Sequence, residues 1–174
     1  MIECKHFHSL SRGTKGICSN GVVYYLAWIS YDVQSVICFD LGSESFNVIK
    51  LPGNIKAEFL ANYSEKIAVT SMLFDGSLDL WVLDDASKQE WSKISIIVMY
   101  WRDLVGNHSF KFKGTLRTGE LIFEPCYSKP YFLLFLDLKK KTARNVMIEG
   151  FGTAYISAEV FLHHVESPMF LKIR

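Results

Sequence analysis

The sequence has little of several features that would place it in a specialised class of protein. It contains 4 cysteines and 4 prolines among 174 residues, and the cysteines are too sparse and irregular for a disulfide framework. The longest uncharged apolar run, from Ile94 to Trp101, is far too short to span a membrane. The 19 basic and 18 acidic side chains nearly balance, which argues against broad charge-driven binding to nucleic acid or to a membrane.

The first residues also lack the apolar stretch of a secretory signal. Together with the few cysteines, this absence favours a reducing compartment. We therefore expect the protein in the cytoplasm, the nucleus or both.

Motifs of reactive sites are missing as well. No nucleophile elbow of the G-x-S-x-G kind and no glycine-rich phosphate loop occurs. Cys4, His6 and His8 alternate and could share one face of a strand, but the paired C-x-x-C of a zinc site is absent. His163 and His164 are neighbours, so on a strand they point to opposite faces. We expect no metal, no cofactor and no catalytic activity.

Aromatic residues, in contrast, are abundant. The 13 Phe, 8 Tyr and 4 Trp make up 14% of the chain, and such residues favour the half-buried surface of a β-sheet. Apolar or alternating runs at Val22–Trp28, Ser35–Phe39 and Phe46–Leu51 are typical of strands. Trp81 and Trp91 fall at strand positions, where we expect them in the core.

These strands belong to a repeat. Asp40, Asp84 and Asp137 each end an apolar strand and open a polar turn, at separations of 44 and then 53 residues. This period is typical of a four-stranded propeller blade. The sequence predicts an all-β fold, namely a partial β-propeller of about three four-stranded, kelch-like blades that could be a fragment of a larger propeller. A β-sandwich of eight or more strands is the alternative.

Several segments, in this order and spacing, resemble the plant F-box associated domain, type 3, the C-terminal propeller-like region of F-box proteins. They are Gly16–Ala27, Val36–Asp40, Phe46–Pro52, Asp75–Asp85, Gln89–Ser92, Thr118–Ile122, Tyr131–Leu138 and Val160–Ser167. The resemblance implies a propeller-like domain over residues 16–166, after a poorly ordered segment 1–15 and before a tail 167–174. It also implies substrate recognition, without catalysis, for a cullin-RING ubiquitin ligase.

The F-box itself, a short Leu-rich helical module, is absent from this sequence. We therefore expect contact with the ligase's adaptor subunit only if an F-box is present upstream. A carbohydrate- or small-ligand-binding propeller fragment is the alternative function. Neither nucleic acid nor membrane is expected as a partner, and the basic run Lys139–Lys141 is interpreted as a solvated hairpin tip.

Blade geometry predicts where a partner protein would bind. In a four-stranded blade, the loop between the second and third strands opens on the same face as the link to the next blade. Exposed aromatic and arginine side chains on such loops are typical interface anchors. The predicted partner-binding residues are Tyr31, Asp32, Phe74, Asp75, Trp101, Arg102, Tyr127 and Lys129.

Overall fold

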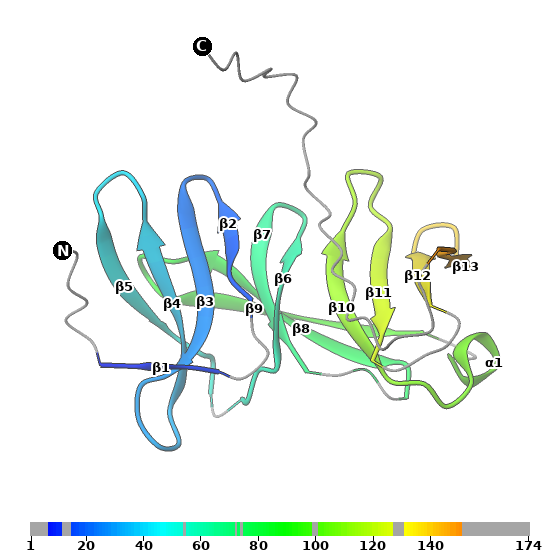
Figure 1. The fold of residues 1–174 in the computed structure, drawn as a ribbon, viewed down its shortest axis with the longest axis horizontal. Coiled ribbons are helices and arrows are strands. Elements are labelled where there is room, and N and C mark those ends of the chain that lie inside the picture. Colours follow the sequence, from blue (N-terminus) through cyan, green and yellow to red (C-terminus); the bar gives the residue numbers. More distant parts are fainter. Residues whose placement is uncertain are drawn as a thin grey trace, which may run out of the picture.

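Short antiparallel strands account for most of the structure, as the aromatic and β-branched composition predicts. The computed structural model describes residues 7–11, 15–53, 55–71, 73, 75–98, 101–126 and 131–150. These residues form three four-stranded antiparallel units in chain order (Figure 1), which we call blades 1, 2 and 3. The predicted all-β fold with three propeller-like blades is therefore confirmed.

Each blade is a meander of four consecutive strands. Blade 1 consists of β2 (Ile17–Ser19), β3 (Val22–Trp28), β4 (Gln34–Asp40) and β5 (Ser45–Lys50). Blade 2 consists of β6 (Phe59–Tyr63), β7 (Lys66–Thr70), β8 (Ser77–Asp85) and β9 (Glu90–Ile97). Blade 3 consists of β10 (Phe110–Thr115), β11 (Leu121–Pro125), β12 (Phe132–Asp137) and β13 (Thr142–Met147).

Two further elements lie outside the meanders. The strand β1 (Ser9–Leu10) precedes blade 1, and the helix α1 (Trp101–Val105) lies between blades 2 and 3. Over the part of the chain that the structure describes, no helix has the length and apolar character needed to cross a membrane.

The first strands of blades 2 and 3 connect these two units. Strands β6 and β10 pair in parallel, with Asn62 opposite Gly114, so blades 2 and 3 share one eight-stranded sheet. Blade 1 forms a separate sheet, in which β1 and β2 pair with different halves of β3. Ser9 and Leu10 belong to the segment 1–15, of which the structure describes residues 7–11 and 15.

Two hydrophobic clusters hold the three blades together. The first packs blade 2 against blade 3 and includes Leu80, Phe110, Phe112 and Phe123. The second packs blade 1 against blade 2 around residues such as Leu26. Because side chains alternate along a strand, blade 2 contributes one face of its sheet to each cluster.

Three of the four tryptophans contact these clusters. Trp81 and Trp91 are half-buried and pack against the cluster of blades 1 and 2, rather than at its centre. The indole Nε1 of Trp91 donates a hydrogen bond to the Lys50 carbonyl oxygen at 3.0 Å, which ties the β8–β9 hairpin to β5. Trp101 is the fully enclosed one, with 3% of its surface exposed.

The turn between the third and fourth strands is the same in every blade. Its first residue is an aspartate whose Oδ1 accepts backbone N–H groups of the turn: Asp40, Asp85 and Asp137. The predicted position in blade 2, Asp84, is wrong by one residue. An irregularity in the pairing of β8 with β9, between Leu83 and Asp85, shifts the register there.

Asp84 serves a different purpose. Its carboxylate forms an ion pair with Lys66 Nζ at 2.6 Å and accepts a hydrogen bond from the Ser92 hydroxyl. Both hydrogen bonds lower the pKa of Asp84 below its usual value, and the bond from Lys66 has the larger effect. The side chain therefore links β7, β8 and β9 at the end of blade 2.

Candidate functional site

The antiparallel meanders fix two ends of the molecule. The loops between second and third strands, and the links between blades, open at one end, which we call the loop face. The turns between first and second strands, and the turns between third and fourth strands in blades 1 and 3, open at the other end, which we call the tip face (Figure 1). In blade 2 the β8–β9 turn reaches the end of β5 instead, where Gln89 Oε1 accepts the Lys50 N–H at 3.2 Å. Five of the eight predicted partner-binding residues are described: Tyr31, Asp32, Asp75, Trp101 and Arg102. The other three lie outside the described residues: Phe74, Tyr127 and Lys129.

Tyr31 and Asp32 lie at the tip of the β3–β4 loop of blade 1. A hydrogen bond from the Ile29 N–H to the Val33 carbonyl oxygen, 2.9 Å long, closes this loop at its base. Both predicted residues are exposed, and Val33 beside them is half exposed. The loop thus presents an aromatic ring, a carboxylate and an apolar side chain together.

The start of β4 anchors this loop to the rest of blade 1. The buried Gln34 amide donates from Nε2 to the Ala57 carbonyl oxygen at 2.8 Å, and its Oε1 accepts the Ala57 N–H at 2.9 Å. Nε2 also donates to the Ser11 hydroxyl at 3.2 Å. One side chain therefore fixes the link between blades 1 and 2 beside the β3–β4 loop.

Asp75 and the helix α1 form a second part of the loop face. The Asp75 carboxylate accepts the Ser77 N–H at 2.9 Å, which shapes the end of the β7–β8 loop. The next residue, Gly76, accepts the Val98 N–H at 2.8 Å. The β7–β8 loop and the chain leading into α1 are therefore joined, and Asp75 and Arg102 are both exposed there.

The expected exposure of Trp101 is wrong. The residue begins α1, whose Trp101 and Val105 lie four positions apart on the buried side of the helix, while Arg102 is exposed. The indole packs edge-on against Phe110 and Phe123, with ring centroids 5.1 and 6.1 Å apart. Trp101 therefore lies in the core beneath α1 and does not belong to the surface of the loop face.

The structure brings some predicted residues together and separates others. Asp75 lies beside α1, which carries Arg102, because Gly76 is in contact with Trp101. Tyr31 and Asp32 belong to blade 1. Figure 1 shows the β3–β4 loop and α1 on the same face but far apart along the long axis of the molecule. The loop face is therefore an extended surface, not a single pocket-sized cluster.

Sequence reasoning missed three apolar side chains at this end. Val33, Ile97 and Leu104 are exposed, and Ile97 at the end of β9 shows 74% of its surface. A usable signal was present for Val33 and Leu104, which follow the predicted residues Asp32 and Arg102 closely in the sequence, but not for Ile97, which lies within a strand. Such side chains add hydrophobic area to a surface that could contact a protein.

A buried polar group supports the third loop of this face. Glu124, at the end of β11, is 7% exposed and accepts a hydrogen bond from the Tyr131 hydroxyl at 2.8 Å. Lys113 Nζ lies 3.3 Å from its other carboxylate oxygen. Burial, followed by the neighbouring Glu124, raises the pKa of Tyr131, so the phenol remains a hydrogen-bond donor. Glu124 on β11 therefore links Lys113 on β10 to Tyr131, which directly precedes β12.

The described histidine and cysteine side chains give no sign of a metal site or of a reactive group. No group of three His, Cys, Asp or Glu side chains that could hold a metal occurs among the described residues. His8 Nε2 lies 2.8 Å from the Tyr25 hydroxyl, while Cys4, His6, His163 and His164 lie outside the described residues. Burial raises the pKa of the Cys38 thiol, which keeps it protonated and poorly nucleophilic.

Comparison with known proteins identifies relatives over nearly the whole length of the chain. It is 48% identical over 177 residues to the F-box/kelch-repeat protein At3g04660 of Arabidopsis thaliana, covering 98% of this chain and 45% of that protein. It is 37% identical to the F-box protein At5g65850 and 34% identical to the F-box protein DOR, both of Arabidopsis thaliana. These alignments cover 98% and 95% of this chain, and 47% and 44% of the relatives.

The chain thus spans somewhat less than half the length of these relatives. No solved structure was found to match it. The family model described as "F-box associated beta propeller domain" matches residues 1–166, which include all three blades. By this match and by its four-stranded blades, the chain belongs to the F-box associated β-propeller domain family.

Proposed function

We propose that this chain is a protein-protein interaction domain, and that it forms the substrate-recognition part of an F-box subunit of a cullin-RING ubiquitin ligase. Membership of the F-box associated family is the observation that carries the proposal. The relatives are F-box proteins by name. An F-box in the whole protein would contact the adaptor subunit, while the propeller blades would contact the substrate.

The loop face supports the second half of this proposal. It exposes Tyr31 and Val33 on the β3–β4 loop and Arg102 on the helix α1, which rest on buried side chains such as Gln34 and Trp101. Tyrosine and arginine are enriched among the residues that dominate binding energy at protein interfaces. A rigid scaffold with varied loops at one end is also a common way to present a recognition surface.

A pull-down from plant tissue tests the proposal. The wild-type chain and the variant Y31A/R102A serve as bait, because both side chains are exposed and neither is needed for the core. A control variant, E44A/N145A, changes two exposed residues outside the loop face. We expect the loop-face variant to lose at least one specific protein that the wild type and the control recover, with recovered proteins identified by mass spectrometry.

Two results would contradict the proposal. Identical sets of recovered proteins for wild type and Y31A/R102A would show that these side chains do not form the binding surface. Saturable binding of a glycan, with no protein recovered, would favour the carbohydrate-binding alternative. Matching urea midpoints for all variants must accompany either result, so that a loss of binding is not a loss of folding.

A further inference from the structure

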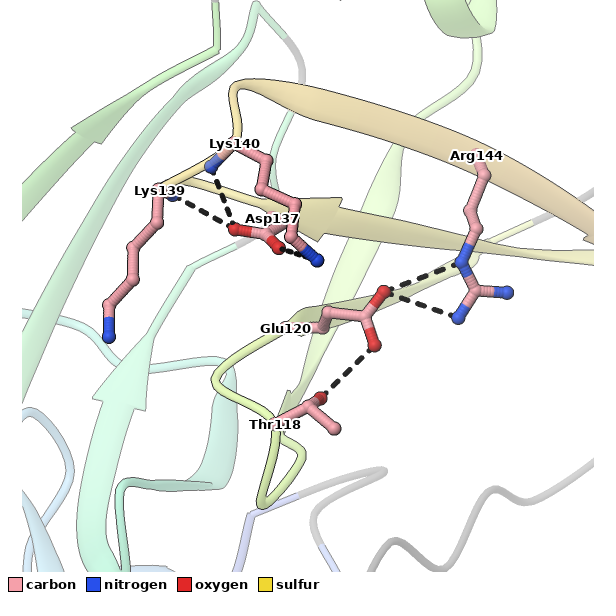
Figure 2. A network of polar contacts seen from close by, with 6 residues as sticks. All are labelled: Thr118, Glu120, Asp137, Lys139, Lys140 and Arg144. Carbon is pink, nitrogen blue, oxygen red and sulfur yellow. Dashed lines mark hydrogen bonds and ion pairs between the residues drawn. The ribbon is translucent and has the colours of Figure 1, made fainter.

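The end of blade 3 on the tip face carries an excess of positive charge. We call this surface the basic tip of blade 3, and it comprises Arg117, Lys139, Lys140, Lys141, Arg144, Glu120 and Asp137. Five basic and two acidic side chains leave a formal charge of +3, whereas the whole chain has +1. The β10–β11 turn and the β12–β13 hairpin meet here, because Glu120 on one side contacts Arg144 on the other (Figure 2).

The two acidic side chains are fully engaged within this surface. Asp137 accepts the N–H groups of Lys139 and Lys140, each at 3.0 Å, and its second oxygen lies 3.3 Å from Lys140 Nζ. Glu120 contacts Nη2 and Nε of Arg144 at 3.2 and 3.4 Å, and its other oxygen accepts the Thr118 hydroxyl (Figure 2).

Three cations remain without an acidic partner. Among the described residues, no carboxylate lies within ion-pair distance of Arg117, Lys139 or Lys141. All three are exposed, and Figure 2 shows the Lys139 side chain extending away from the polar network. The internal contacts therefore fix the backbone of the hairpin and leave these charges available.

The other blades show that the hairpin does not need these lysines. Asp85 in blade 2 accepts the N–H groups of Ser87 and Lys88 and pairs with Lys88 Nζ at 3.4 Å, as Asp137 does with Lys139 and Lys140 in blade 3, and it also accepts the Ser87 hydroxyl. The fourth residue after the aspartate has a positive φ in all three blades, at Glu44, Gln89 and Lys141. Blade 1 forms this turn with Gly42-Ser43-Glu44 and blade 2 with Ser87-Lys88-Gln89.

We propose that the basic tip of blade 3 is a second interaction surface, which binds an acidic segment of another protein. Its unpaired cations are not required for the turn, and they are concentrated in one blade of an otherwise nearly neutral chain. An acidic peptide fits them better than nucleic acid does, because stacking of bases requires an accessible ring. Among the described residues, Phe135 is a ring in contact with this surface, and it has the Arg144 guanidinium 4.1 Å from its centroid.

This inference goes beyond the proposed function and does not depend on it. The basic tip is on the tip face, at the opposite ends of the strands from Tyr31 and Arg102. A variant of the loop face should therefore leave binding at the basic tip unchanged. The two proposals can fail separately.

Fluorescence anisotropy with a labelled ten-residue oligoglutamate peptide tests the inference. The variant K139S/K141Q gives blade 3 the turn sequence of blade 2 and keeps the Lys140–Asp137 ion pair. The control K50Q/K56Q removes the same charge from two exposed positions elsewhere. We expect saturable binding that weakens between 50 and 150 mM salt, a loss of at least about threefold for K139S/K141Q, and no change for K50Q/K56Q or Y31A/R102A.

Three results would overturn the inference. They are the absence of saturable binding to the peptide, an equal loss in both charge variants, and tighter binding of a ten-nucleotide oligouridylate or of vesicles containing phosphatidylserine. The single variant R117Q provides a second test in the β10–β11 turn, should the double variant fold poorly. It should weaken peptide binding in the same direction, and unchanged binding would count against the proposal.

Discussion

At the scale of single residues, a glycine makes the packing of Trp101 possible. Gly76 has φ +87°, and a Cβ built on it would lie 2.7 Å from the Trp101 Cβ and 2.8 Å from the Val98 carbonyl oxygen. Neither neighbour can move without disturbing α1 or the end of β9. The β7–β8 loop therefore requires glycine here both for its conformation and for its space.

Replacing Gly76 with alanine should be more destabilising than the same change at Gly119. Gly119 has nearly the same φ, +88°, but nothing lies within 4 Å of a Cβ built there. The backbone penalty is about 1–2 kcal/mol at both sites, and overpacking adds about 1–3 kcal/mol at Gly76 alone. Urea unfolding of the two variants measures the difference, and equal losses would show that the contact with Trp101 is easily relieved.

Gln34 is the other single residue with a large expected effect. Replacing it with alanine leaves the buried N–H and carbonyl groups of Ala57 without their side-chain partner. Each buried group that loses its partner costs about 1–3 kcal/mol, so we expect Gln34→Ala, which affects two such groups, to reduce the free energy of unfolding by about 2–6 kcal/mol. Asn145→Ala, an exposed change in β13, should stay within about 0.5 kcal/mol in the same urea titration.

At the scale of elements, the aspartate turns make stability depend on pH. Hydrogen bonds from turn N–H and hydroxyl groups hold the pKa values of Asp40, Asp85 and Asp137 below their usual range, and that of Asp85 falls to about 2. A carboxyl group whose pKa is lower in the folded state stabilises that state. The full stabilisation is present at pH values above the pKa of the unfolded chain, near 3.8. This stabilisation is lost as pH falls through the folded pKa.

The triple variant D40N/D85N/D137N isolates this effect, because asparagine retains a hydrogen-bond acceptor but cannot titrate. We expect wild type to be more stable than the variant above pH 4, and the difference to shrink steadily as pH falls toward 2. Urea midpoints at intervals between pH 2 and 6 give the profile. A difference that stays constant across this range would mean that the three carboxylates do not titrate as the hydrogen bonds require.

The elements also show what the sequence could and could not predict. Alternation and turn residues located Val22–Trp28 without error, and the aspartate spacing identified the blades. The same spacing placed the turn of blade 2 at Asp84 instead of Asp85, because a bulge depends on the pairing partner and not on the strand's own sequence. The helix at Trp101 was missed because five residues give too short an apolar pattern, although Trp101, Val105 and the following glycine are consistent with one.

At the scale of the whole molecule, strand order alone determines at which end of its own blade each loop opens. The distance between loops does not, because it depends on how each blade packs against the next. The predicted residues Asp75 and Arg102 therefore share a region with α1, while Tyr31 lies on a separate loop of blade 1. A single partner that contacts both regions must therefore cover an extended face.

The packing of the blades makes unfolding a property of the whole molecule. On β7, Ala68 belongs to the cluster of blades 2 and 3, whereas its neighbour Val69 belongs to the cluster of blades 1 and 2. Opposite faces of the same strands thus carry both clusters. Neither outer blade can lose its packing without exposing one face of blade 2 to water, which destabilises the remaining pair.

Leu80→Ala should therefore weaken blade 1 as well as blades 2 and 3. Leu80 is completely buried in the cluster of blades 2 and 3, and its truncation should cost about 2–5 kcal/mol. Native-state hydrogen exchange should show the slowest amides of β3, β4, β7, β11 and β12 accelerated by a common factor. The reciprocal variant Leu26→Ala should accelerate β11 and β12, while the exposed change Leu41→Ala should leave all of them unaltered. Acceleration confined to blades 2 and 3 in the first variant would show instead that blade 1 is held by its own sheet, and that the two clusters unfold independently.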